Sequence, residues 1–349
     1  MSSTILFLGV GIDQIPAIQK AKELKLKIIG FDGNPTAAGL RYCEHHEVLD
    51  IRDKDLVEKA ARKWNKKVGL DGIICPATEF GPQAGRVCDV LGLNGVSEKT
   101  ADLMTDKVYR RGKLGKAGIP QPRWSPVKEG WDIFPCVIKP RNKSAAQGVK
   151  LIENRSQLAK EEFDLVEEYI DGWEISTECV IFDNTFICFH ADRNYEFKHK
   201  YAPFMLENGC QLPSKINDRI KRKIETLIEK LISLFGLKNC VMKLDLVVRD
   251  NIVYVLECPP RLGGGKLSSH MIPLYSGIDY WKLAIKIAAG IPILTHEIIP
   301  TKTKFVAQRY KFPEDPKSHK DRLGDVIETG DTYEEAVKKA EEAIRGEDK

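Results

Sequence analysis

The segment Val241–Gly265 has the sequence VMKLDLVVRDNIVYVLECPPRLGGG and contains two apolar runs separated by a polar turn at Arg249–Asn251. Apolar residues alternate along both runs, which predicts two β-strands joined as a hairpin. Asp245 and Glu257 are twelve residues apart in the sequence, and the hairpin would place them side by side. Two neighbouring carboxylates need a bound cation, a shared proton or separate cationic partners.

Arg261 and the glycines Gly263–Gly265 follow the second run directly. A guanidinium can stabilise developing negative charge, and glycine lets the backbone approach a ligand closely. The alternative is a flexible glycine-rich turn beside a surface arginine. Carboxylate oxygens are ligands that Mg²⁺ prefers. The order of these residues therefore favours a metal site that holds a phosphate group.

The composition excludes several classes of protein. A chain of 349 residues with 42% hydrophobic content suits about two or three packed domains. Its formal net charge of +4 is too small to indicate nucleic-acid binding, and no apolar run reaches membrane length. Met1-Ser-Ser leads straight into an expected strand, so we expect no signal peptide and a cytoplasmic protein. The nine cysteines include no C-x-x-C pair, which favours free thiols over zinc binding.

The first hundred residues show a strand–helix–strand pattern. Strands are expected over Thr4–Leu8, Lys27–Phe31 and Gly72–Cys75, with a helix over Ile15–Leu24. This order predicts an α/β fold with an open parallel sheet.

Gly9 and Gly11, with Asp32 about twenty positions later, form half of a dinucleotide-binding fingerprint. The position of the third glycine is Gln14. The incomplete motif favours a tight strand-to-helix turn near a ligand over NAD binding.

Lys139 ends an expected strand over Pro135–Lys139 and precedes the small-residue loop Arg141–Gly148. A lysine at this place can reach a phosphate, while backbone N–H groups of the loop, which includes Ser144, cover it. The alternative is a solvated lysine at a strand end.

A further strand over Asp164–Ile170 contains the acidic pair Glu167 and Glu168. Adjacent strand residues point to opposite faces, so one of the two could simply lie at the surface. An adenine base would need a hydrogen-bond acceptor and an apolar platform, for which Ile170 is a candidate. Glu174 could accept hydrogen bonds from ribose hydroxyls.

The rest of the chain continues the mixed pattern. Helices are expected over 107–117, 217–235, 280–289 and 332–344, and strands over 149–152 and 305–312.

Taken in order, these motifs resemble the ATP-grasp superfamily, in the carboxylate–amine ligase branch that includes L-amino-acid ligases, biotin carboxylase and carbamoyl-phosphate synthetase. The resemblance covers almost the whole chain. It implies an α/β and α+β architecture with an open parallel pre-ATP-grasp domain over 1–100 and a two-lobed ATP-grasp domain over 101–292. A phosphate-loop lobe would occupy about 125–172, and a small C-terminal module 293–349.

The resemblance also implies roles for individual residues. Arg261 matches the catalytic arginine, and Asp245 and Glu257 match the metal-binding acids. The expected nucleotide-binding residues are Lys107, Lys139, Ser144, Gly148, Glu167, Glu168, Ile170 and Glu174. One position departs from the family pattern Glu-x-Asn-x-Arg, because Pro259 replaces the asparagine and has no side-chain oxygen. In the family, that asparagine supplies an oxygen to a second Mg²⁺. Here either a single metal dominates, or a water, a carbonyl or Asp245 completes the second metal site.

The activity implied by the resemblance is ATP-dependent ligation of a carboxylic acid to an amine through an acyl phosphate, with release of ADP and phosphate. The expected cofactors are ATP and Mg²⁺, with Mn²⁺ as a substitute, and the expected partners are small-molecule substrates and a second copy in a homodimer, without nucleic acid or membrane. Two alternatives remain: a bicarbonate-dependent carboxylase acting through carboxyphosphate, and an ATP-binding protein without turnover, which Pro259 motivates.

Overall fold

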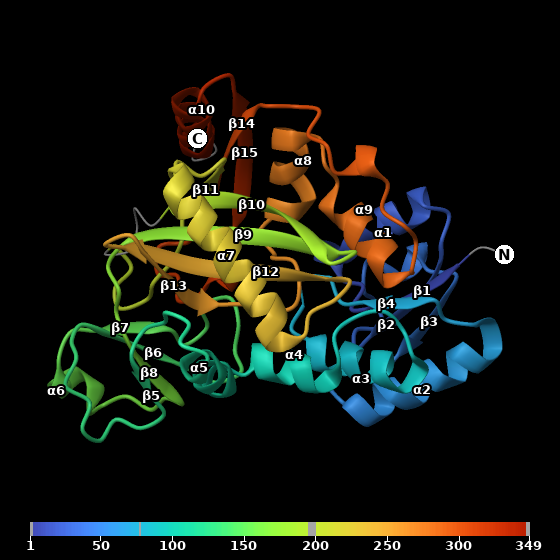
Figure 1. Cartoon of the computed structure of the whole chain (residues 1–349), viewed down its shortest axis with the longest axis horizontal. Helices are drawn as coiled ribbons and strands as arrows, with labels where there is room; N and C mark the ends of the chain where they lie inside the picture. The colour runs from blue at the N-terminus through green and yellow to red at the C-terminus, as the bar shows by residue number, and fades with distance from the viewer. Residues whose placement is uncertain (1–2, 77, 195–199, 347–349) are drawn as a thin grey trace.

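The computed structural model describes residues 3–76, 78–194 and 200–346. Three sheets organise the described chain (Figure 1). The first is the parallel sheet β3-β2-β1-β4, which confirms the open α/β fold expected for the N-terminal region. Its strands are β1 (Thr4–Leu8), β2 (Lys27–Asp32), β3 (His45–Val48) and β4 (Gly72–Ile74), and its helices are α1 (Ile15–Glu23), α2 (Lys54–Val68) and α3 (Gly81–Leu91).

Both faces of this parallel sheet are buried, because helices pack against each of them. Along β1, Ile5 and Phe7 belong to one hydrophobic cluster, whereas Leu6 and Leu8 belong to another. The helices of the two clusters cover opposite faces of the sheet.

The second sheet has seven antiparallel strands in the order β13-β12-β9-β10-β11-β14-β15. The strands are β9 (Trp173–Phe182), β10 (Thr185–Asn194), β11 (Gly209–Leu212), β12 (Cys240–Arg249), β13 (Ile252–Glu257), β14 (Phe305–Lys311) and β15 (Gly324–Gly330). The long strands β9 and β10 do not follow from the sequence pattern. Buried polar residues, including Ser176 and Glu178, break the apolar alternation of β9.

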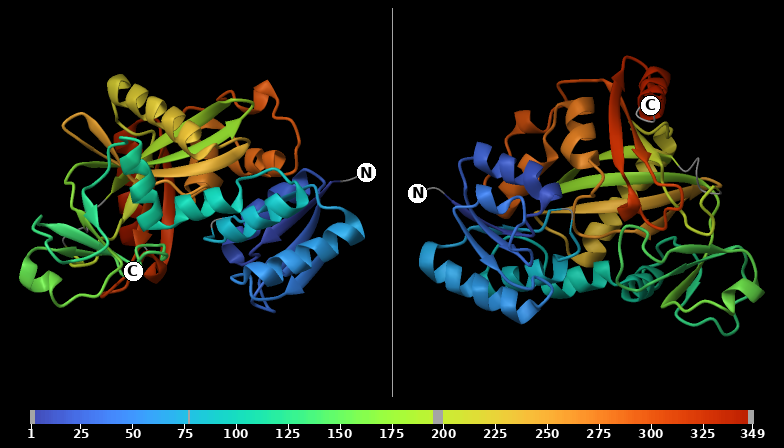
Figure 2. Two further views of the ribbon diagram at one scale, coloured as in Figure 1. Left: turned by 60° about the horizontal axis from the view of Figure 1, so that its bottom comes forward. Right: turned by 180° about the vertical axis from the view of Figure 1, so that it is seen from behind.

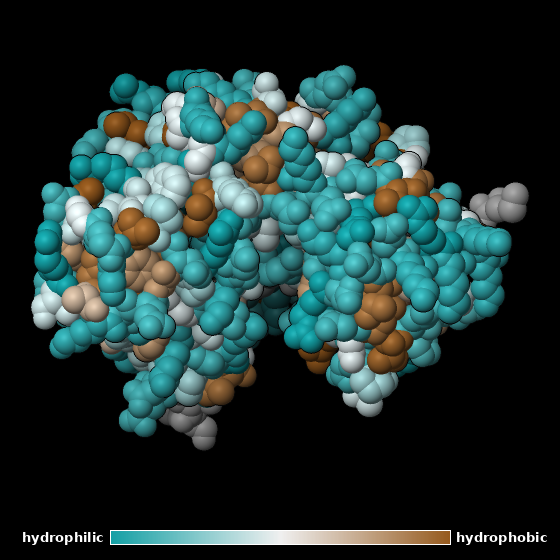
Figure 3. Space-filling model, turned by 90° about the horizontal axis from the view of Figure 1, so that it is seen from below, coloured by the Kyte–Doolittle hydropathy of each residue, from teal (hydrophilic) through white to brown (hydrophobic). Residues whose placement is uncertain are grey.

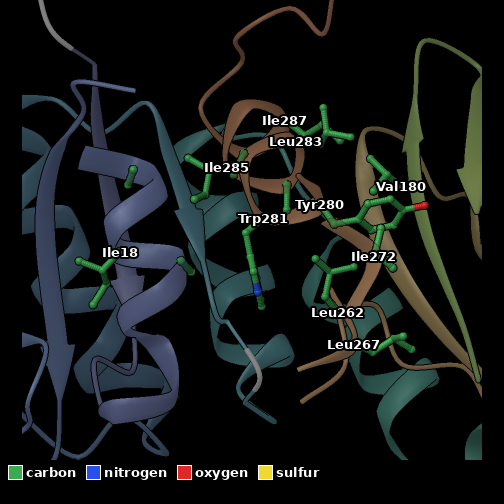
Figure 4. Close-up of a cluster of buried hydrophobic side chains, with 14 of the residues drawn as sticks. Ile18, Val180, Leu262, Leu267, Ile272, Tyr280, Trp281, Leu283, Ile285 and Ile287 are labelled. Carbon is green, nitrogen blue, oxygen red and sulfur yellow. The ribbon is translucent and has the colours of Figure 1, made fainter. Parts of the chain in front are cut away.

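Helices cover both faces of the seven-stranded sheet. Figure 1 shows α7 (Asp218–Phe235) crossing one face, where Ile224 and Leu231 are fully buried. On the other face, α9 (Tyr280–Ala288) packs between this sheet and the N-terminal sheet, and α8 (Ile272–Ser276) packs on β14. Figure 4 shows Trp281 of α9 projecting between the N-terminal strands and Leu262. One continuous core therefore joins the two parts of the chain.

The third sheet is small and antiparallel, in the order β5-β8-β6-β7. It consists of β5 (Trp124–Ser125), β6 (Cys136–Lys139), β7 (Lys150–Ile152) and β8 (Leu165–Glu168), with the short helix α6 (Arg155–Leu158). Helices α4 (Glu98–Thr105) and α5 (Lys107–Lys116) connect the N-terminal part to this sheet (Figure 2).

The C-terminal strands do not stand apart, because β14 pairs with β11 and so extends the seven-stranded sheet. Helix α10 (Tyr333–Gly346) packs on β14 and β15. Thr332 begins this helix, since its hydroxyl accepts a hydrogen bond from Glu335 N at 3.1 Å. The division into domains at residues 100 and 293 stays a prediction. No helix of the described chain is long and apolar enough to cross a membrane.

Replacing Ile224 with alanine tests the packing of α7. The side chain is fully buried in the cluster that α7 forms with β9 and β12. Its truncation should lower the free energy of unfolding by about 2–5 kcal/mol, because a cavity remains. Urea denaturation followed by circular dichroism measures the loss, and the exposed Lys221→Ala on the same helix is the control. Equal stability of the two variants would contradict this packing.

Candidate active site

The hairpin predicted from the sequence is present as β12 and β13, with Asp245 directly opposite Glu257. The register shifts after this pair, because Leu246 lies opposite Val255 and leaves Leu256 as an extra residue. Such a bulge locally bends a strand and redirects its groups. The carbonyl of Leu256 accepts hydrogen bonds from Arg110 at 3.3 Å and Arg111 at 3.0 Å, so the bulge is fastened to α5.

Asp245 is buried among cations. The ammonium of Lys243 lies 2.6 and 2.5 Å from its two oxygens, and Arg193 lies 3.5 Å away. Ser176 donates a further hydrogen bond at 2.7 Å. Burial alone would raise the pKa of this carboxyl, but Lys243 and Arg193 hold the pKa well below its usual range. Asp245 is therefore an ionised oxygen donor at neutral pH.

Glu257 has a similar environment. Lys107, the first residue of α5, places its ammonium 3.9 Å from the carboxylate. Burial favours the neutral acid, but the charges of Lys107 and Arg110 lower the pKa of Glu257 to about 2. Lys107 itself is buried, which lowers its pKa, and it donates to the carbonyl of Lys143 at 2.6 Å. Lys107, which was predicted to bind phosphate, therefore lies close both to Glu257, a predicted metal ligand, and to the small-residue loop that contains Lys143.

Glu167 is fully buried between two cations. Its oxygens accept from Arg111 Nε at 2.6 Å and Lys139 Nζ at 2.7 Å. Despite burial, these cations hold the pKa of Glu167 far below its usual range. The carboxylate therefore orients Lys139, and its contact with an adenine stays a prediction. The neighbouring Glu168 points elsewhere, toward Arg123 at 3.1 Å and Arg249 at 3.4 Å.

Arg193 joins two of the predicted subsites. Its guanidinium lies 3.6 Å from Glu174, the candidate ribose contact, and 3.5 Å from Asp245. Glu207 accepts two hydrogen bonds from it, at 3.0 and 2.8 Å. The sequence analysis missed Arg193, because an arginine at the end of an unpredicted strand gives no signal of its own. Ile170 is buried, as an apolar platform requires.

The loop that contains Ser144 and Gly148 is held in a tight conformation. Ala145 and Ala146 have φ values of 53° and 56°, in the left-handed region that alanine rarely adopts, and Gly148 has φ 70°. The carbonyl of Ala145 accepts a hydrogen bond from His319 N at 3.0 Å, so the C-terminal segment anchors this loop. No sequence pattern predicted that contact.

Arg261 reaches back to the N-terminal part of the chain. Its guanidinium forms an ion pair with Glu79, which follows β4, and donates to the carbonyl of Leu262 at 3.2 Å. Nearby, the fully buried Glu178 accepts hydrogen bonds from Gly263 N at 3.0 and 3.1 Å. Burial raises the pKa of Glu178 to about 7, although Lys243 and the Gly263 N–H oppose the shift.

The carbonyl of Pro259 is already occupied. It accepts a hydrogen bond from Lys243 N of β12 at 3.1 Å and another, within a tight local turn, from Arg261 N at 2.9 Å. Among the described residues, no group of three or more His, Cys, Asp or Glu side chains converges. Asp245 and Glu257 fit a divalent cation only if other oxygens, such as those of phosphates, complete its shell.

Comparisons with known proteins, by family model and by sequence, point to the same family. Residues 104–265 match the family model described as an ATP-grasp domain. This part of the chain is an ATP-grasp domain. D-alanine–D-alanine ligase A of Bacillus cereus is 26% identical over 288 residues, which cover 72% of this chain and 89% of that protein.

Solved structures share the whole fold. An L-amino acid ligase from Bacillus licheniformis superimposes with a TM-score of 0.81 at 18% identity and covers 98% of this chain and 96% of its own. A phosphoribosylglycinamide synthetase from Anaerococcus prevotii gives a TM-score of 0.79 at 20% identity, with coverages of 99% and 98%. The family and the fold class predicted from the sequence are confirmed.

All predicted site residues from Lys107 to Arg261 lie within the matched ATP-grasp range. Glu79 and His319, which contact Arg261 and the loop at Ala145, lie outside it. Figure 3 shows a deep hollow on the lower face, between the side of the small sheet and the side of the N-terminal sheet. Its rim is mostly hydrophilic. The hollow gives room for a polar ligand between the two parts of the chain.

The raised pKa of Glu178 predicts a pH-dependent stability. Between pH about 4.3, where an unfolded glutamate titrates, and about 7, the native protein binds more protons, so its stability falls as pH rises. Glu178→Gln removes this dependence. From about pH 5 to about pH 8 the variant should gain roughly 2–4 kcal/mol relative to the native chain.

Urea denaturation across this pH range measures the difference. The exposed Glu229→Gln on α7 is the matched control and should follow the native chain. Parallel stability curves for Glu178→Gln and the native chain would contradict the assigned pKa.

Proposed function

We propose that this protein is an ATP-dependent ligase that joins a carboxylic acid to an amine and releases ADP and phosphate. The observation that carries the proposal is the arrangement of Lys107, Asp245, Glu257 and Arg261, with Lys139 oriented by a buried carboxylate. Phosphoryl transfer needs cations on the phosphates and oxygen ligands for a metal, and this site supplies both. D-alanine–D-alanine ligase A, a relative by sequence, is by name a ligase of this kind.

The residues fit a divalent cation together with ATP. Asp245 and Glu257 are ionised and already have an ammonium beside them, Lys243 and Lys107 respectively. Asp245 and Glu257 would hold Mg²⁺ or Mn²⁺, which would supply positive charge to the phosphates. Lys107 and Lys139 supply positive charge to the phosphates, and the segment 141–149 supplies backbone N–H groups to cover them.

The reaction proceeds in two balanced steps. A carboxylate oxygen of the acid forms a bond to the γ-phosphorus while the bond from that phosphorus to the ADP oxygen breaks, which yields an acyl phosphate and ADP. The amine nitrogen then bonds to the acyl carbon, phosphate leaves with the bridging oxygen, and the nitrogen loses a proton. Arg261 stabilises the charge on the acyl phosphate and on the tetrahedral oxyanion.

Catalysis rests on positioning, because no side chain needs to form a covalent bond. Glu167 fixes Lys139, and Asp106 caps α5 by accepting from Val108 N and Tyr109 N, which sets the direction of Lys107. We assign 1–100 to a pre-ATP-grasp domain, 101–292 to the ATP-grasp domain and 293–349 to a C-terminal module whose His319 anchors the loop.

A substrate screen tests the activity. The protein is incubated with ATP, Mg²⁺ and pooled amino acids, and ADP is measured against a substrate-free control. ADP formation above the control supports ligation. ADP formation that depends on bicarbonate instead would indicate chemistry through carboxyphosphate. Tight ATP binding without ADP formation in any pool would indicate a non-catalytic protein, the alternative suggested by Pro259 in place of the family's asparagine.

Replacing Arg261 with alanine should separate chemistry from ATP binding. The guanidinium acts on charge that develops in the reaction, so kcat should fall by about a hundredfold or more. The affinity for a non-hydrolysable ATP analogue should change by less than about threefold, because Lys107 and Lys139 remain. ADP release and equilibrium binding measure the two effects. Arg52→Ala, which removes only a surface pair with Asp50, is the control.

Removing the metal with EDTA should abolish ADP formation, and Mg²⁺ or Mn²⁺ should restore it. In Glu257→Gln, one charged ligand is lost, so the Mg²⁺ concentration for half-maximal activity should rise by about tenfold or more. A metal titration of ADP release measures this shift. An unchanged Mg²⁺ requirement would remove Glu257 from the metal site.

A further inference from the structure

Two of the nine cysteines face each other across the hairpin formed by β9 and β10. Cys179 of β9 lies directly opposite Cys188 of β10. Both are free thiols, and Cys179 is buried whereas Cys188 is half-buried. The simplest interpretation is that both are small core residues, as cysteines often are. The geometry of the pair and its polar neighbours indicate a further role.

The turn of this hairpin sets the distance between the two cysteines. It has two residues with φ values of 46° and 61°, and it is flanked by Phe182 and Thr185, which lie opposite each other. In such a hairpin the flanking residues form a hydrogen-bonded pair, and non-hydrogen-bonded pairs alternate with hydrogen-bonded ones from there on. Cys179 and Cys188 are the third pair beyond Phe182 and Thr185, so they form a non-hydrogen-bonded pair.

The spacing of a non-hydrogen-bonded pair suits a disulfide. The Cα atoms of such a pair are about 4.5 Å apart. A disulfide needs Cα atoms about 4.4–6.8 Å apart. Cys179 and Cys188 can therefore be joined without moving the two strands.

A histidine on the same face of the sheet contacts Cys188. Nε2 of His190 lies 3.7 Å from the sulfur of Cys188, and Nδ1 lies 2.8 Å from the hydroxyl of Thr177, the residue opposite His190. With the Nδ1 proton directed at Thr177, Nε2 can accept the thiol proton of Cys188. A base that is oriented by a third group activates a neighbouring thiol. Among the described residues these side chains form no metal site.

The thiol of Cys188 differs from the other half-buried thiols. The hydrogen bond with the Cys179 thiol, and then the contact with His190, lower the pKa of Cys188, although burial opposes the shift. By contrast, burial raises the pKa of Cys43 to about 12 and that of Cys75 to about 11. The thiolate is the nucleophilic form of cysteine, so Cys188 is the most reactive of these three at neutral pH.

The position of Cys188 in the sheet leaves its sulfur accessible. β11 pairs with β10 over Asp192–Asn194, beyond Cys188, and the described residues form no further strand pairing on that side of Cys188. A small oxidant can therefore reach Cys188, whereas Cys179 is shielded. Accessible thiolates beside a second cysteine are the thiols that oxidants convert to disulfides.

We propose that Cys188 is an oxidation site that reacts with a hydroperoxide and then forms a disulfide with Cys179. The thiol proton of Cys188 passes to His190, and the sulfur bonds to one oxygen of hydrogen peroxide while the O–O bond breaks. The other oxygen leaves as hydroxide and takes the proton from His190, which gives water and a sulfenic acid on Cys188.

The second step joins the two cysteines. The sulfur of Cys179 bonds to the sulfur of Cys188 while the S–O bond breaks. The departing hydroxyl takes the proton of Cys179 and leaves as a second water. Two thiols are oxidised to one disulfide, and one peroxide is reduced to two waters.

The disulfide lies within a strand pair that supports the proposed metal ligand. β9 supplies Ser176 and β10 supplies Arg193 to Asp245. The oxidation itself does not depend on the ligase activity, because it needs only the two thiols, His190 and a hydroperoxide.

Peptide mapping of the full chain tests the proposal. The reduced protein is treated with hydrogen peroxide, alkylated and cleaved before aspartate residues. Cleavage before Asp183 separates the two cysteines, so a disulfide keeps their peptides joined until reduction. We expect joined peptides and the loss of two of the nine free thiols. Absence of joined peptides, or oxidation spread evenly over all cysteines, overturns the proposal.

Replacing Cys179 with serine separates the two steps. The reactive sulfur remains, so Cys188 should stop at the sulfenic acid, which dimedone labels. Cys43→Ser is the matched control, because Cys43 is also half-buried, and this variant should still form the disulfide. Equal dimedone labelling of Cys188 in the two variants would contradict the role of Cys179.

Alkylation rates test the role of His190. At neutral pH, iodoacetamide should modify Cys188 at least about tenfold faster than Cys43 in the unaltered chain. His190→Gln should slow the reaction of Cys188 by about tenfold and leave that of Cys43 unchanged, whereas a general loss of structure would speed both. Equal rates for the two thiols in the unaltered chain would overturn the proposal even if His190→Gln does not fold.

Discussion

One fully buried guanidinium ties together the segments on which the site depends. Arg111 projects from α5, donates to Glu167 of β8 at 2.6 Å and donates to the carbonyl of Val255 in β13 at 2.6 Å. Because Glu167 also holds Lys139, the small sheet, α5 and the catalytic hairpin share one network. A buried charge is stable only when its hydrogen bonds are satisfied. This requirement constrains how the small sheet lies against the hairpin.

Around this network, the site is built from charges that compensate one another before any ligand binds. Asp245 has Lys243 and Arg193 beside it, and Glu257 has Lys107. The arrangement keeps both carboxylates ionised at neutral pH, since nearby cations outweigh the cost of burial. A metal and phosphates would therefore exchange partners with existing ion pairs instead of creating new buried charges. Electrostatic preorganisation of this kind is how phosphoryl-transfer sites stabilise charge.

The predictions from the sequence succeeded where a local pattern carried the information. The hairpin, the helix over Asp218–Phe235 and the N-terminal strands follow from apolar periodicity. The pairing of Asp245 with Glu257 also depends on the extra residue Leu256, which the turn between the strands does not predict. The strands β9 and β10 were not predicted. Buried polar residues in both strands interrupt the alternation of apolar side chains that would indicate a strand. Arg193 was missed with them, although it contacts Asp245.

The sequence by itself determined the order of motifs, the family that this order implies and the residue types available for phosphate and metal binding. Only the tertiary structure decided which charges meet, since Glu79 and Arg261 are separated by 182 positions and His319 lies far from the loop at Ala145. Periodicity reports on neighbours within one element, whereas an ion pair between elements depends on how their faces pack. The Val241–Gly265 segment predicted its own hairpin, but its partners came from elsewhere in the chain.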